Sequence, residues 1–171
     1  MARRRLPRDC TRPAHGPAPD DALDTRRRRR HSAAIRWEHF DHAADLGVRG
    51  RGASVAEAFE AAALAVTAAV TDPRRVAAHE TIEVECQGQD LALLLYDWLN
   101  RVIYEMASRG LVFGRFHVEL TPAGLRGSMA GERIAPARHA PAVEPKGATL
   151  TALEVREEAP GSWLAQCVVD V

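Results

Sequence analysis

Two aspartates and the end of the chain have the chemistry to hold a metal ion together. Asp45 lies in a short polar segment between two predicted strands, and Asp170 is the penultimate residue, directly after an apolar run typical of a buried strand. The Asp170 side chain therefore stands beside the terminal carboxylate of Val171. Hard divalent cations such as Ca²⁺ accept a flexible mixture of carboxylates, carbonyls and waters. If the first and last strands are neighbours, Asp45 completes such a site; a turn cap at Asp45 and a solvated terminus are the alternatives.

Other chemistry has little support in the sequence. It contains no P-loop, GxGxxG, HExxH or GxSxG segment, and its seven histidines form no i, i+4 pair on a predicted helix. Cys10, Cys86 and Cys167 are far apart, which excludes a CxxC motif and a disulfide scaffold and is typical of a reducing, cytoplasmic compartment. No apolar stretch reaches the length that a membrane-spanning helix needs.

The zero net charge hides two parts of opposite sign. Residues 1–34 carry ten Arg against four Asp, whereas the remainder carries 13 basic and 19 acidic residues. The first part has four prolines and no aromatic residue, so it cannot bury enough surface to offset its chain entropy. We predict that residues 1–34 form a disordered arginine-rich tail. Its run at 26–30 either binds RNA phosphates or a membrane surface, or is simply solvated.

Residues 35–171 show the pattern of a folded domain. One helix is predicted over 56–70, after a capping box of Ser54 and Glu57, and a second over 91–109, between Asp90 and Gly110. Strands are predicted over 36–40, 46–51, 81–86, 112–120, 125–130, 149–155 and 163–169, and a loop over 132–147. This order predicts an α+β domain with two helices packed on one face of a largely antiparallel sheet.

The second helix has two distinct faces. Trp98 and Met106 lie on its apolar stripe and are expected in the core. Asp97 and Asn100 lie on the opposite face and are expected to be solvated.

Several separated segments resemble the archease family, in the family's order and spacing, over residues 37–171. Residues 40–48 (FDHAADLGV) resemble its DHTADxGI segment, and residues 88–100 (GQDLALLLYDWLN) resemble the motif on its second helix. Gly131 and Glu132 match its GE step, residues 144–149 its EVKAVT segment, and residues 168–171 its terminal VVLDI. The sequence departs from the family at Ala43, Pro145, Leu150 and Thr151.

The resemblance implies a protein cofactor and not a catalyst. Archeases activate the tRNA-splicing RNA ligase, which joins 3′-phosphate or 2′,3′-cyclic phosphate ends of RNA to 5′-hydroxyl ends. They promote guanylylation of the ligase by GTP and its repeated turnover. The resemblance thus implies a cytoplasmic role in tRNA splicing and RNA repair, with RNA contacted through the ligase. It also implies a calcium ion, or another hard divalent cation, bound by Asp45, Asp170 and Val171.

The resemblance also assigns residues to activation of the partner. Lys146, the only lysine beside 22 arginines, matches the lysine that the family requires, and a compact ammonium suits a phosphate or an acidic partner. His42 is expected to orient the polar segment, with a ligand role as the alternative, and Glu132 to cap a loop or contact the partner. Two other functions stay open: a metal-dependent phosphoesterase or nuclease using the same carboxylates, and an RNA-binding or chaperone-like module acting through the tail.

Overall fold

The computed structural model describes residues 36–43 and 45–171. The predicted disordered tail over residues 1–34 lies outside these residues. The chain forms, in order, β1 (Arg36–His42), β2 (Asp45–Gly52), α2 (Val55–Val70), the 3₁₀ helix η1 (Pro73–Arg75), β3 (Glu80–Gln87), α3 (Leu91–Arg109), β4 (Leu111–Thr121), β5 (Gly124–Arg133), α4 (Pro136–His139), β6 (Gly147–Ala148), β7 (Glu154–Ala159) and β8 (Ser162–Asp170).

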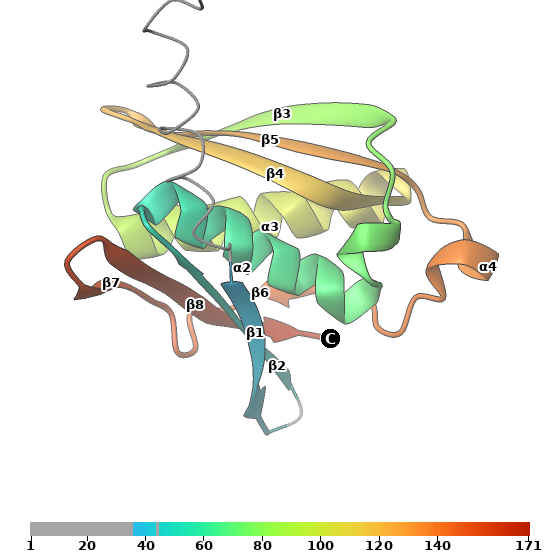
Figure 1. Cartoon of the computed structure of the whole chain (residues 1–171), viewed down its shortest axis with the longest axis horizontal. Coiled ribbons are helices and arrows are strands. Elements are labelled where there is room, and N and C mark those ends of the chain that lie inside the picture. Colours follow the sequence, from blue (N-terminus) through green and yellow to red (C-terminus); the bar gives the residue numbers. More distant parts are fainter. Residues whose placement is uncertain (1–35, 44) are drawn as a thin grey trace, which may run out of the picture. The chain divides into compact units, whose positions relative to one another are not determined.

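The strands form two antiparallel sheets with the two long helices between them (Figure 1). One sheet has the order β1-β2-β8-β6, with β7 also paired to β8, and the other has the order β3-β5-β4. The α+β class is therefore confirmed. The arrangement differs from one sheet under two helices, because α2 and α3 contact a sheet on each side.

The helix caps predicted from the sequence are present at the start of α2 and at both ends of α3. The Ser54 hydroxyl accepts the N–H of Glu57 at 3.2 Å, and the Glu57 side chain accepts the N–H of Ala53 at 2.7 Å. Asp90 accepts the N–H of Leu93 at 3.0 Å, and α3 ends at Gly110 in the left-handed conformation, with φ of 64°. None of the helices among the described residues is both long and apolar enough to cross a membrane.

The core lies where α2 meets both sheets. A Cβ atom added at Gly50 would collide with the main chain of α2 at Ala58 and Ala62, so this glycine lets the helix lie directly on β2. Trp98 of α3 is fully buried, and its Nε1 donates to the carbonyl oxygen of Phe59 at 3.2 Å. The expected burial of Trp98 and Met106 is confirmed.

Two predictions for the C-terminal half are wrong. The strand predicted over 149–155 forms only at its last two residues, because β6 ends at Ala148 and the chain turns before β7 begins at Glu154. Thr149 and Thr151 instead bond to the main chain of Val168, and Ala152 takes a positive φ of 51°. The loop predicted over 132–147 contains the end of β5 and the short helix α4.

Candidate functional site

The strand order brings residues from three parts of the chain to one end of the five-stranded sheet. His42 of β1 is the register partner of Asp45 of β2. Leu46 is the partner of Val169, so the next step along both strands sets Asp45 opposite Asp170. On the other side of β8, Asp170 is the partner of Gly147, which directly follows Lys146. The first and last strands of the sequence prediction are thus in one sheet, joined through β2.

Both aspartates lie on the face of the sheet that is turned away from the helices. Val48 and Val169 are fully buried in the core beneath the helices. Side chains alternate along a strand, so Asp45 and Asp170 point to the opposite face. Asp170 is exposed and Asp45 is half-buried. The two carboxylates are therefore side by side on a surface that water and a partner can reach.

Lys146 is held at two points by the end of β8. Its main-chain N–H donates to the carbonyl oxygen of Asp170 at 2.8 Å. Its Nζ atom donates to an oxygen of the terminal carboxylate of Val171 at 2.9 Å. The ammonium group is otherwise exposed, so it places a positive charge beside the predicted cation ligands.

His42 adds to the site a buried ring nitrogen that lacks a hydrogen-bond partner among the described residues. Within the described residues, the Nδ1 atom of His42 is buried and makes no hydrogen bond. Buried polar atoms nearly always have a partner, so such an atom requires an explanation, for which a bound water or ion is a common one. The expected role of His42 as an internal hydrogen bonder has no support at Nδ1, because this is the atom left unpaired.

The donor set suits a hard cation more than a transition metal. Asp45, Asp170 and the Val171 carboxylate all offer oxygen, the ligand atom that Ca²⁺ prefers, and exposure on this face leaves room for waters to complete its coordination. Across residues 36–43 and 45–171, no three His, Cys, Asp and Glu side chains gather as a metal site would require. Any cation held here therefore depends on a main-chain carboxylate in addition to the two aspartates.

One aromatic ring lies next to the site on the same face of the sheet. The Phe40 ring covers Gly47, since a Cβ atom at position 47 would collide with it, and Arg49 lies over the ring at 4.7 Å from its centre. Further along, Glu38 accepts hydrogen bonds from both Arg49 and Arg51, and these bonds lower the pKa of its carboxyl. The arginines nearest the site are therefore already paired.

Asn100 is close to this site, and the residue pattern of its helix does not indicate this. It was expected to be solvated, but its side-chain amide bonds to both main-chain groups of Ala148 in β6. The neighbouring expectation holds, because Asp97 is exposed. Nothing in the residue types distinguishes the two positions; only the fold brings β6 against one of them.

Glu132 does not join the other candidate residues. It lies at the end of β5 in the three-stranded sheet and is buried. It accepts the N–H of Ala77 at 2.7 Å, and its other oxygen is paired with Arg138. The bond from Ala77, followed by those from Arg138 and His139, lowers the pKa of Glu132 to about 2.

A buried histidine completes this separate network. The N–H of Ala135 donates to Nδ1 of His139 at 2.9 Å, so Nε2 carries the proton and donates to Glu132 at 3.3 Å. Glu132 thereby ties α4 and the segment before β3 to the end of β5. Its observed contacts are internal, which agrees with the loop-capping alternative.

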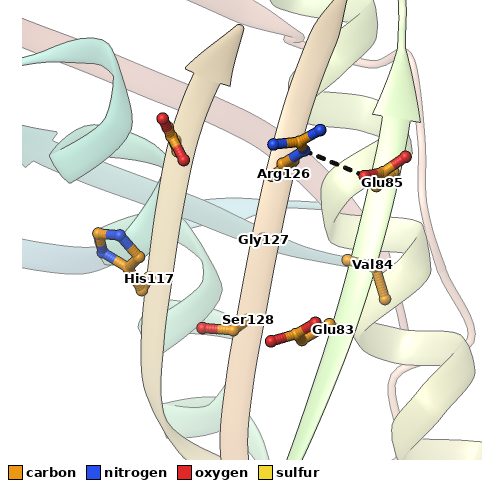
Figure 2. A pocket seen from close by; sticks show the side chains of 8 residues that line it. Glu83, Val84, Glu85, His117, Arg126, Gly127 and Ser128 are labelled. Atoms are coloured by element: carbon orange, nitrogen blue, oxygen red, sulfur yellow. Dashed lines mark hydrogen bonds and ion pairs between the residues drawn. The ribbon is translucent and has the colours of Figure 1, made fainter.

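The outer face of the three-stranded sheet carries a second polar surface. Figure 2 shows Glu83, Ser128 and His117 on neighbouring strands, and Arg126 donating to Glu85 at 3.1 Å. They border a shallow pocket of about 320 Å³. None of the candidate residues from the sequence lies in it.

The comparisons with known proteins agree on one family. The model of the archease protein family (MTH1598/TM1083) matches residues 37–171. The chain is 38% identical over 139 residues to "Protein archease" of Pyrococcus furiosus, covering 79% of this chain and 98% of that protein. It is 36% identical over 138 residues to "Protein archease" of Sulfolobus acidocaldarius, covering 80% and 99%. The solution structure of protein 1598 of Methanobacterium thermoautotrophicum matches with a TM-score of 0.65 and 31% identity, covering 79% and 98%.

Proposed function

Because this chain belongs to the archease family, we propose that it is a protein cofactor that activates a tRNA-splicing RNA ligase. In this role it promotes guanylylation of the ligase by GTP and its repeated turnover, in tRNA splicing and RNA repair. The RNA is contacted by the ligase, which joins 3′-phosphate to 5′-hydroxyl ends.

The observation that carries the proposal is the alignment of Asp45, Asp170 and Lys146 at one exposed end of a sheet. These residues come from β2, β8 and the residue before β6, and strand pairing brings them together. A protein that acts on another protein's nucleotide site needs an accessible group of fixed charges. This end of the sheet offers carboxylates and one ammonium, and the main-chain bond from Lys146 to Asp170 joins the segments that carry them.

The carboxylates of Asp45, Asp170 and Val171 would hold a calcium ion or another hard divalent cation. When bound, the ion supplies a concentrated positive charge on this surface. Asp45 and Asp170 balance that charge and fix the ends of β2 and β8 relative to each other. Lys146, beside them, presents its ammonium to a phosphate or a carboxylate of the ligase.

The test is a guanylylation assay of the ligase with GTP, with and without this protein. We expect wild type to accelerate guanylylation and Asp45→Ala or Asp170→Ala to abolish the acceleration while the circular dichroism spectrum is unchanged. Glu83→Ala is the matched control, because it removes an exposed carboxylate from the other sheet (Figure 2). Full stimulation by both aspartate variants would refute the proposed role of this site.

The same preparation tests the alternative of a phosphoesterase or nuclease. The protein alone is incubated with nucleotides and RNA in the presence of Mg²⁺ or Mn²⁺. We expect no hydrolysis above that of the Asp45→Ala variant. Turnover without ligase that disappears in this variant would favour the enzyme.

A further inference from the structure

Asn100 joins helix α3 to strand β6 through its side-chain amide. Its Oδ1 accepts the N–H of Ala148 at 3.0 Å, and its Nδ2 donates to the carbonyl oxygens of Ala148 at 3.2 Å and Tyr96 at 3.0 Å. One planar amide thus bonds to both main-chain groups of a single residue, as a neighbouring strand would. A Cβ atom added at Gly147 would lie 3.3 Å from Oδ1, so the amide sits directly against β6.

Strand β6 needs such support because it is very short. It consists of Gly147 and Ala148 and lies at the end of the sheet order, paired to β8 only at Asp170 and Val169. The recorded main-chain bonds to β8 flank the strand, from Lys146 to Asp170 and from Thr149 to Val168. Asn100 holds the strand from the helix side, while β8 holds it from the other.

Lys146 directly precedes this strand, so the position of its ammonium follows from where β6 lies. We infer that Asn100 is a positioning residue for Lys146: by fixing Ala148, it keeps Nζ within reach of the Val171 oxygen. The inference deepens the proposed function, on which the importance of Lys146 for the ligase rests. That Asn100 positions Lys146 is inferred from the contacts of Asn100 and does not depend on the ligase.

Lys146 is the only lysine in the 171 residues, which makes its position directly measurable. Protein grown with ¹³C,¹⁵N-lysine gives a single set of lysine side-chain signals in an NMR spectrum. The readouts are the nuclear Overhauser contact between the Lys146 side chain and Val171, and the hydrogen-exchange rate of the Ala148 amide. Neither readout requires the ligase.

The test variant is Asn100→Leu, which keeps a similar volume and removes the polar amide. We expect exchange of the Ala148 amide to become about tenfold faster or more, the Lys146–Val171 contact to weaken, and stimulation of the ligase to fall. Asn100→Asp keeps the acceptor for the Ala148 N–H and should lose less. Asp97→Ala is the control, because it removes an exposed polar side chain from the same helix and should change none of these readouts.

The outcomes separate this inference from the proposed function. An unchanged Lys146–Val171 contact in both Asn100 variants would overturn the positioning role, whatever the ligase does. If the contact is lost and Lys146→Ala still stimulates the ligase fully, Asn100 positions a lysine that the ligase does not use. In that case the positioning role stands and the role of Lys146 in the proposed function fails.

Discussion

The main-chain N–H of Lys146 donates to the carbonyl oxygen of Asp170 at 2.8 Å, so the functional lysine of the proposal and one of its two aspartates are bonded through the backbone. Neither residue can shift without disturbing the other. The lysine and the proposed cation ligands therefore form one unit, and a change in either should affect the same activity.

Replacement of Lys146 by arginine should remove most of the stimulation. Arginine keeps the positive charge, but its planar guanidinium is larger and its donors have a fixed geometry, so it does not place a compact charge at the same point. We expect Lys146→Arg to lower ligase guanylylation about tenfold or more, with an unchanged melting temperature. Stimulation equal to wild type would mean that charge alone suffices and would contradict the proposed contact.

Calcium should stabilise the protein through the two aspartates. A ligand that binds only the folded state adds about 2.7 kcal/mol to the free energy of unfolding at 100 times its Kd. We expect added Ca²⁺ to raise the melting temperature of wild type, EDTA to reverse the rise, and Asp45→Asn to abolish it. Glu83→Gln should respond as wild type does. An equal rise in the Asp45 variant would show that calcium binds elsewhere.

The Glu132 network should make stability depend on acid pH. The pKa of Glu132 is lowered from 4.5 to about 2, so its ionised form stabilises the folded state above pH 4.5, and this contribution is lost as the pH falls towards 2. We therefore expect Glu132→Gln to lower the melting temperature by several degrees at pH 7. The difference from wild type should shrink steadily between pH 5 and pH 2. A difference that stays constant over this range would argue against the carboxylate as its cause.

Gly50 should tolerate no side chain. A methyl group there would collide with the main chain of α2, which cannot retreat without opening the core between the helix and β2. We expect Gly50→Ala to cost about 1–3 kcal/mol, measured as the free energy of unfolding in urea. An unchanged urea midpoint would show that the helix moves away at no cost.

The sequence allowed the helices and the two aspartates to be predicted, because local chemistry determines them. Ser54, Asp90 and Gly110 mark helix ends through caps that involve only nearby residues. Asp45 and Asp170 were predicted to meet on the condition that the first and last strands are neighbours, and the family resemblance implied both as ligands together with the terminal carboxylate. The order of the strands around them depends on pairing between distant segments, which residue patterns do not encode.

The errors have the same physical origin. The strand predicted over 149–155 has a suitable alternation, but bonds from Thr149 and Thr151 to Val168 turn the chain before β7. Asn100 was expected in solvent because its helix face is polar, and the position of β6 against that face is a tertiary contact. For Glu132 a loop cap and a partner contact were both open, because its hydrogen bonds with Ala77 and His139 are formed only in the fold.

The short length of β6 also affects whether two molecules of this protein can pair strand to strand at this sheet edge. Exposed sheet borders invite a second chain to add its own strand, which is a common route to aggregation. On this side of β8 the border consists of β7 and β6, and at the two residues of β6 an amide from the adjacent helix already occupies both main-chain groups of Ala148. The contact that holds the lysine segment in place thus also leaves no free main-chain group at Ala148 for a strand of a second chain to pair with.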